Sequence, residues 1–180
     1  MADPTYGYLI IAGMALLLAS AGFHKLRGLG RFMELFAAYR LIPESLARRT
    51  AWVIPWLELA AAAGLLWTST RRASVVFAMI VLLAYAAALS VNLLRGRRDL
   101  DCGCGAAHER RAIAAWMVWR NLLLAAVLGI ALLPWSPRAL GLTDFLTFAG
   151  GLIVLATLYV AVDRLLGDVA PRTLLLKRTA

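Results

Sequence analysis

The sequence is poor in charged residues, which make up only 16% of its 180 residues. Soluble domains carry about 25% charged residues, whereas 62% of this chain is hydrophobic and its mean hydropathy is +0.77. The apolar runs also lack the alternation of every second residue that marks a barrel strand. This composition excludes an ordinary soluble domain. It predicts membrane-spanning helices, because lipid offers backbone N–H and C=O groups no hydrogen-bond partner.

Long apolar runs dominate the chain, and a helix of about 20 such residues crosses the hydrocarbon core of a bilayer. Five runs reach about this length, at residues 7–24, 51–69, 73–94, 112–134 and 145–166. We therefore expect an all-α, polytopic transmembrane helix bundle of about five spans in the lipid bilayer. Residues 1–180 then form a single integral membrane domain. A short amphipathic helix at residues 29–41 is predicted to lie in the headgroup plane, because its apolar side chains share one stripe.

Positive charge is absent from the start of the chain, where no lysine or arginine precedes Lys25. A signal peptide begins with basic residues, so we expect the first run to persist as an uncleaved helix. The net charge of +9 is concentrated in the segments 25–49 and 95–111 and in the tail after residue 171. Five spans place these segments on one side, which the positive-inside rule makes cytoplasmic. This distribution argues against nucleic acid as a partner.

Only two cysteines occur, and they form Cys102-Gly103-Cys104 inside the arginine-rich segment 95–111. Cationic neighbours lower the pKa of a thiol and favour the reactive thiolate. A disulfide across so small a ring is strained, and strain makes it easier to reduce. We expect Cys102 and Cys104 to be the catalytic pair of a thiol–disulfide exchange, with a quinone as reoxidant. His108 is either a proton donor to the pair or an ordinary solvated histidine.

Three other interpretations of the cysteine pair stay open, and with them the question of whether the chain is an enzyme. Thiolates select soft metal ions, so the chain is alternatively a soft-metal-ion carrier or sensor. Two sulfurs, however, supply only half of a usual zinc site, and the sequence contains no zinc-ligand array, so we assign no metal ligands. The second interpretation is a purely structural disulfide, which would add little to the stability of the fold because it closes a very short loop. In a non-catalytic membrane chaperone subunit, the cysteines are incidental.

Four polar side chains interrupt or border the apolar runs, where charge is costly and marks a site by default. They are His24, Glu58, Asn92 and Arg120. Counted from the basic ends of their runs at 1.5 Å per residue, Glu58 lies about 10 Å deep and Arg120 about 12 Å deep. We therefore expect an ion pair between Glu58 and Arg120. The four residues form a candidate cofactor-binding pocket under the cysteines, or alternatively polar contacts that only fix helix packing.

Several short segments occur in a characteristic order. They are Gly22-Phe23-His24-Lys25-Leu26-Arg27, then Phe36 with Tyr39-Arg40-Leu41-Ile42-Pro43, then Ile54-Pro55-Trp56-Leu57-Glu58, and finally Asn92-Leu93-Leu94-Arg95-Gly96-Arg97 leading to Cys102-Gly103-Cys104-Gly105. This order resembles the MauE family of methylamine-utilisation membrane proteins over roughly residues 8–135 and, more distantly, the DoxX-like membrane proteins. The family commonly has an aromatic residue between the second cysteine and its glycine, whereas Cys104 here meets Gly105 directly.

The resemblance implies a multi-pass protein of the bacterial cell inner membrane that helps to mature an exported, disulfide-rich enzyme of the amine dehydrogenase type. It implies a thioredoxin-like partner, and Cys102 and Cys104 as the redox pair. Disulfides for exported proteins form outside the cytoplasm, whereas the arginine distribution places the cysteines inside. The side that the cysteines face therefore stays open, as do the direction of electron flow and the oligomeric state.

Overall fold

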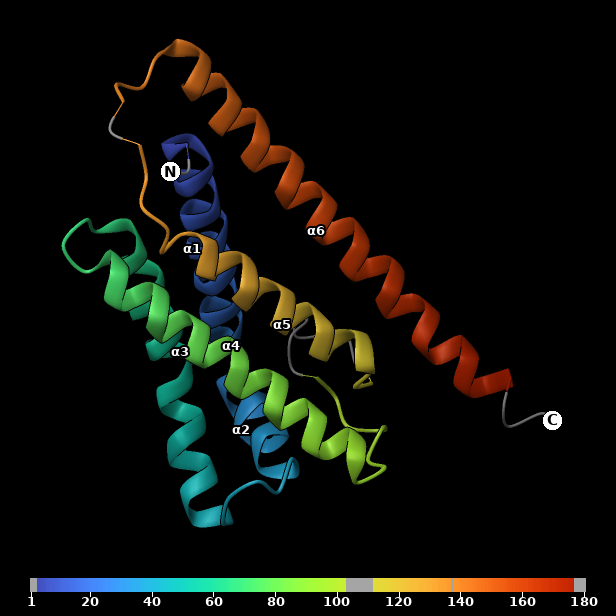
Figure 1. The fold of residues 1–180 in the computed structure, drawn as a ribbon. Coiled ribbons are helices and arrows are strands. Elements are labelled where there is room, and N and C mark those ends of the chain that lie inside the picture. Colours follow the sequence, from blue (N-terminus) through green and yellow to red (C-terminus); the bar gives the residue numbers. More distant parts are fainter. Residues whose placement is uncertain (1–2, 103–111, 137, 177–180) are drawn as a thin grey trace.

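The computed structural model describes residues 3–102, 112–136 and 138–176, and these residues form helices and connecting segments without a β-strand. The helices are α1 (Pro4–Arg27), α2 (Leu29–Ala38), α3 (Glu44–Leu66), α4 (Arg71–Leu94), α5 (Ala115–Ile130) and α6 (Leu142–Leu176). Helices α1, α3, α4 and α5 pack as a bundle, and α6 leans along it (Figure 1). The predicted all-α transmembrane bundle is confirmed.

In the described part of the chain, three helices are long and apolar enough to cross a membrane, namely α1, α4 and the Leu142–Leu166 part of α6. Helix α5 is apolar but has only 16 residues. It starts later than predicted because the chain before it is extended, with the Ile113 N–H donating to the Leu100 carbonyl at 2.9 Å. Helix α3 has 23 residues and begins at Glu44, seven residues before the predicted run, so its first turns are polar.

The predicted amphipathic helix is present as α2, but it ends at Ala38 rather than at residue 41. Tyr39 caps it, and Arg40 adopts a positive φ of 48°. A residue in this left-handed conformation terminates a helix and turns the chain away. The short α2 therefore returns the chain to α3 at the same end of the bundle at which α1 finished.

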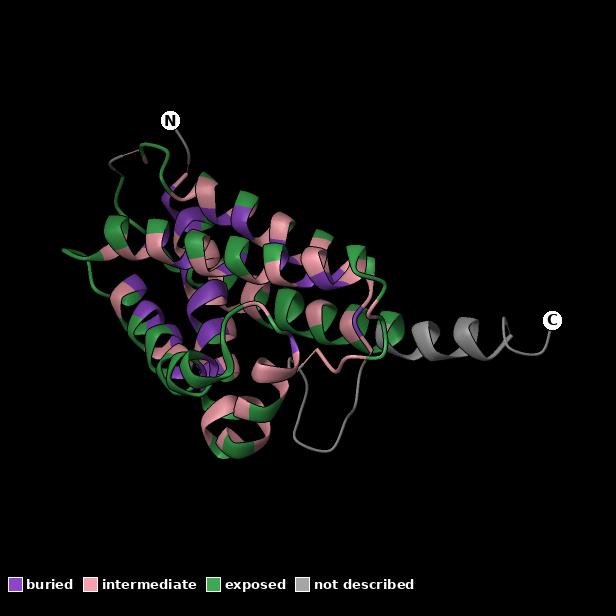
Figure 2. Cartoon of the chain, turned by 90° about the horizontal axis from the view of Figure 1, so that it is seen from below, coloured by how far each residue is buried: buried purple, intermediate pink, exposed green. Residues whose placement is uncertain are grey.

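The apolar core lies where α1, α3, α4 and α5 face one another. Its buried side chains come from all four helices and include Met14 and Leu18 of α1, Leu65 of α3, Leu82 of α4 and Leu128 of α5. Figure 2 shows the buried residues on the inward stripes of these helices. None of the α6 residues whose burial is described is buried. Some of them pack against α1, such as Leu152 beside Gly13, whereas others, such as Ile153 and Leu165, face the surroundings of the bundle.

Helices α1 and α3 approach closely at Gly22. A Cβ atom added to Gly22 would lie 2.9 Å from the Pro55 carbonyl oxygen and 3.1 Å from Leu59 Cγ. Small residues at such crossings let membrane helices come close enough to gain dispersion energy. This crossing also fixes where the next turn of α1 lies along the axis of α3.

We predict that Gly22→Ala destabilises the bundle by about 1–3 kcal/mol, the usual cost of forcing an extra methyl group into a packed interior. Gly13→Ala on the same helix is the matched control, because its added Cβ would lie 3.9 Å from its nearest neighbour, Leu152. Thermal unfolding in detergent measures both. Equal midpoints for the two variants would contradict the assigned crossing.

Candidate functional site

A buried ion cluster of Lys25, Glu58 and Tyr85 joins α1, α3 and α4. Glu58 is 0% exposed, and its Oε1 accepts hydrogen bonds from Lys25 Nζ and from Tyr85 Oη, the latter at 2.6 Å. Lys25 Nζ also lies 3.0 Å from Tyr85 Oη and over the rings of Tyr85 and Phe32. The cluster therefore compensates a buried carboxylate with one cation and one hydroxyl.

The second carboxylate oxygen of Glu58 is not compensated in this way. Glu58 Oε2 is buried and has no hydrogen-bond partner in the described part of the chain. A buried acceptor that makes no hydrogen bond costs about 1–3 kcal/mol, and such orphaned groups are rare in native structures. The cluster thus presents an acceptor that a proton or a ligand donor can satisfy.

The predicted ion pair between Glu58 and Arg120 is wrong. Glu58 pairs with Lys25 of α1, whereas Arg120 Nη1 lies 2.6 Å from Asp163 Oδ1 of α6. The predicted depths specify how far along its helix axis each residue lies, but not the direction in which its side chain points around the helix. On α5 the next residue, Asn121, is the one that is buried, and Arg120 is turned away from it by about 100° toward α6.

His24 also departs from the predicted pocket, because its side chain is exposed on α1. Its neighbour Lys25 occupies the interior instead, with 9% of its side chain exposed. The reason is again direction around the helix, since Gly22 faces α3 and Lys25, three residues later, lies on the same face.

Asn92, the fourth predicted pocket residue, is fully buried near the end of α4 and takes part in a clasp with Arg97. Its Oδ1 accepts from Arg97 Nη1 at 3.1 Å. The same guanidinium donates to the carbonyl oxygens of Ala38 at 2.8 Å and of Tyr39 at 3.3 Å. These are carbonyls at the C-terminus of α2, which an isolated helix leaves unpaired. The Arg97 clasp therefore fixes α2 to α4.

The segment before the cysteines is anchored through Asp101. Arg31 Nη2 of α2 lies 2.7 Å from Asp101 Oδ2, and Tyr39 Oη donates to the Asp101 carbonyl oxygen at 3.4 Å. Burial, together with the nearby Asp101 charge, raises the pKa of Tyr39 well above its ordinary value, so this phenol stays protonated and able to donate. Asp101 also forms an antiparallel bridge with Ala112. These contacts hold the cysteine segment, which we define as residues 95–112, at Asp101 and at Ala112.

Cys102 is half-buried and packs against an apolar layer formed by Tyr39, Leu89, Ile113 and Met117. It is disulfide-bonded rather than a free thiol. Cys104 and His108 lie outside the described residues. No group of three or more His, Cys, Asp or Glu side chains suited to a metal ion occurs in the described ranges.

The structure aligns part of the predicted site along α4. Tyr85, Leu89 and Asn92 follow one another at spacings of four and three residues, which places them on one helix face. The buried ion cluster at Tyr85 therefore lies about 6 Å below Leu89 along the helix axis, and Leu89 belongs to the layer under Cys102. Glu58, Asn92 and Cys102 are thus gathered at one end of the bundle, whereas the side chains of His24 and Arg120 point elsewhere.

The partners of the predicted charges were not anticipated, namely Lys25 and Tyr85 for Glu58 and Asp163 for Arg120. Lys25 belongs to a motif segment, but it entered the prediction only as one of the positive charges of the segment 25–49. Asp163 is an acid inside the last apolar run, and the rule that selected Glu58 and Arg120 applies to it equally. Tyr85 gives no comparable signal, because tyrosine is common in apolar runs.

We predict that Lys25→Met destabilises the protein strongly, by about 3–5 kcal/mol, because it leaves the Glu58 carboxylate buried without a cation. The double variant Lys25→Met with Glu58→Met should recover most of this loss, since it removes both charges. A double-mutant cycle on unfolding in detergent measures the coupling. Additive losses in the double variant would show that the two residues do not interact.

We further predict that Arg97→Gln loosens α2 without unfolding the bundle, because it removes the hydrogen bonds to Ala38 and Tyr39. Hydrogen exchange of the amides in residues 29–41 should become faster. Arg98→Gln is the control, since Arg98 is exposed. Unchanged exchange in Arg97→Gln would contradict the clasp.

Comparison with known proteins identifies the family of this sequence. The sequence model described as "Methylamine utilisation protein MauE" matches residues 4–136. Methylamine utilisation protein MauE of Methylophilus methylotrophus is 33% identical over 92% of this chain and 88% of its own length. The protein of the same name from Methylorubrum extorquens is 38% identical over 77% of this chain and 76% of its own. No solved structure matches. The chain therefore belongs to the MauE family of methylamine utilisation proteins, and it is a membrane protein.

Proposed function

We propose that this chain is a membrane thiol–disulfide exchange factor in methylamine utilisation, with Cys102 and Cys104 as its reactive pair. The observation that carries the proposal is the anchoring of the cysteine segment. Asp101 is fixed to α2 by Arg31 and Tyr39, and Cys102 rests on an apolar layer at the end of the bundle. A cysteine held this way at the membrane surface is presented to a partner protein by a rigid support.

The exchange itself requires no group other than the two cysteines and a partner dithiol. A partner thiolate attacks one sulfur of the Cys102–Cys104 disulfide, and the other sulfur leaves as a thiolate. The second partner thiolate then attacks the mixed disulfide, so that the partner becomes oxidised and this chain becomes a dithiol. Two electrons pass from the partner to this chain. The reverse sequence delivers reducing equivalents to the partner.

Reoxidation of the dithiol needs a two-electron acceptor, for which we propose a membrane quinone. When bound, a quinone would accept two electrons and two protons. The residues that fit this role are those of the buried ion cluster, because the Lys25 ammonium has a third N–H beyond those that it donates to Glu58 and Tyr85. Glu58 Oε2 is an acceptor without a partner in the described part of the chain. Within the chain, Glu58 would hold a proton released by the thiols, and Lys25 would stabilise the carboxylate after that proton has left.

The proposed partners follow from this chemistry and from the family. A thioredoxin-like protein would exchange disulfides with Cys102 and Cys104, and an exported disulfide-rich protein of the amine dehydrogenase type would be the final client. We place the chain in the bacterial inner membrane. The arginines that flank the cysteines favour the cytoplasmic side for them, whereas an exported client requires the outer side. The soft-metal carrier and the chaperone subunit are the alternatives.

The decisive experiment expresses cysteine-to-serine variants of this protein in a methylamine-using strain that lacks its own MauE protein. We predict that Cys102→Ser and Cys104→Ser each abolish growth on methylamine, and that one of them accumulates a mixed disulfide with a partner, because resolution needs the second thiol. Arg98→Gln is the control in the same segment. Wild-type growth of the double serine variant would exclude thiol chemistry and support the chaperone subunit.

A further inference from the structure

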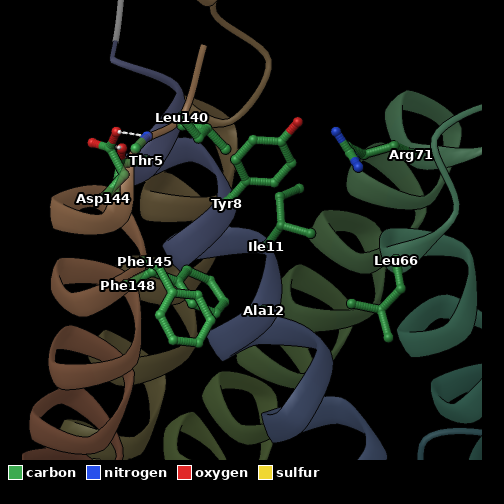
Figure 3. Close-up of a pocket in the computed structure, with 11 residues that line it drawn as sticks. Thr5, Tyr8, Ile11, Ala12, Leu66, Arg71, Leu140, Asp144, Phe145 and Phe148 are labelled. Carbon is green, nitrogen blue, oxygen red and sulfur yellow. Dashed lines mark hydrogen bonds between the residues drawn. The ribbon is translucent and has the colours of Figure 1, made fainter.

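A pocket of about 490 Å³ opens at the end of the bundle opposite the cysteines. It lies between the first turns of α1 and α6, the last turn of α3 and the start of α4 (Figure 3). Its deeper wall is apolar and includes Ile11, Leu66, Phe145 and Phe148. Tyr8 and Arg71 stand at its upper edge, with the Tyr8 hydroxyl and the Arg71 guanidinium on the same side of the space.

Arg71 has no anionic partner within the described ranges. The two carboxylates at this end, Asp3 and Asp144, are both engaged by Arg138, at 3.0 Å and 2.5 Å. Arg71 Nε is buried and makes no hydrogen bond in the described part of the protein. The pocket therefore contains an uncompensated cation at the edge of an apolar space.

Aromatic rings hold the Arg71 side chain in this position. Its guanidinium carbon lies 5.2 Å from the centroid of the Tyr8 ring and 5.5 Å from that of the Trp135 ring. Trp135 can lie close to α1 because Gly7 has no side chain. A Cβ atom at Gly7 would lie only 2.4 Å from the Trp135 ring. Cation–π contacts orient a guanidinium through its faces and leave its N–H donors free. The donors of Arg71 are therefore preorganised for a ligand.

The chemistry of such a ligand follows from the two parts of the pocket. A guanidinium matches the oxygens of a phosphate in a bidentate arrangement, and the apolar wall suits a hydrocarbon chain. Arg71 is the first residue of α4, a span of 24 residues, so its guanidinium lies at the level of lipid headgroups. The exposed apolar side chains of α6, such as Ile153 and Val160, continue the apolar surface away from the pocket.

We propose that this pocket binds an acidic phospholipid, with Arg71 on the lipid phosphate and the start of one acyl chain against Phe145 and Phe148. Phosphatidylglycerol carries the net negative charge that compensates Arg71. The site does not depend on the proposed thiol chemistry, because it lies at the opposite end of the bundle.

The test is retention of lipid by the purified protein, measured by native mass spectrometry after equilibration with phosphatidylglycerol or phosphatidylcholine. We expect the wild type to retain phosphatidylglycerol preferentially. Arg71→Gln should weaken retention by about tenfold, the equivalent of one charge-assisted hydrogen bond. Arg72→Gln removes the same charge from an exposed neighbour and should retain lipid normally. Equal losses in both variants, or no loss in either, would overturn the site.

A second pair of variants tests the apolar wall. Ala12 lines the pocket, so Ala12→Phe should fill it and lower lipid retention, whereas Leu16→Phe on the exposed side of α1 should not. In the wild type, a photoreactive phosphatidylglycerol should cross-link to residues 66–71 and 140–148. Cross-links spread evenly along α6 would overturn the proposal. Displacement of the lipid by millimolar inorganic phosphate would assign the site to a free anion and reject the lipid.

Discussion

A carboxylate buried among membrane helices must be compensated from within the protein, and Glu58 imposes this requirement on the whole bundle. Its partners come from two different helices, so α1 and α4 must both approach α3 at the same height. The close contact of α1 with α3 at Gly22 sets the position of α1 along α3. Side chains tilt toward the N-terminus of their helix, and Lys25 therefore reaches back from the turn after Gly22 to meet Glu58. The closest helix contact and the buried charge are parts of one arrangement.

The two proposed functional sites lie at opposite ends of the bundle. The cysteine segment and the Arg97 clasp lie where α1 and α4 end, whereas Arg71 and Arg138 lie where α4 and α6 begin. Helix α1 has 24 residues and is therefore about 36 Å long. Electrons do not pass directly between sites so far apart without a carrier between them. The proposed thiol site and the proposed lipid pocket are thus separate, and we expect a substitution in one to leave the other intact.

Much of the architecture was predictable, because hydrophobicity and helical periodicity determine it. The apolar runs predicted the helices, the stripe of apolar side chains at residues 29–41 predicted α2, and the placement of the arginines and cysteines predicted one common end of the bundle. The pairing of buried charges was not predictable from these signals. Counting residues into a span gives depth, whereas the partner of Glu58 depends on direction around each helix. Lys25 rather than His24 points inward, and Arg120 points to Asp163, because of rotations of about 100° per residue.

The segments that carried the family resemblance turn out to meet in pairs. Residues 22–27 face residues 54–58 through Gly22, Pro55, Lys25 and Glu58. Residues 39–43 and 92–97 meet through Arg97, which binds the Tyr39 carbonyl oxygen and Asn92. No sequence rule applied to a single segment reveals such contacts, since each needs two helices in their final register.

The Arg97 clasp has a mechanical consequence. Because one guanidinium holds both the buried amide of α4 and the terminal carbonyls of α2, the short helix cannot swivel unless the end of α4 tilts with it. Arg31 and Tyr39 extend this coupling from α2 to Asp101, directly before Cys102. The position of Asp101 and Cys102 therefore depends on the position of α2 and of the end of α4. If the proposed partner displaces Cys102, the movement passes through Asp101, α2 and Arg97 to the end of α4, which carries Tyr85.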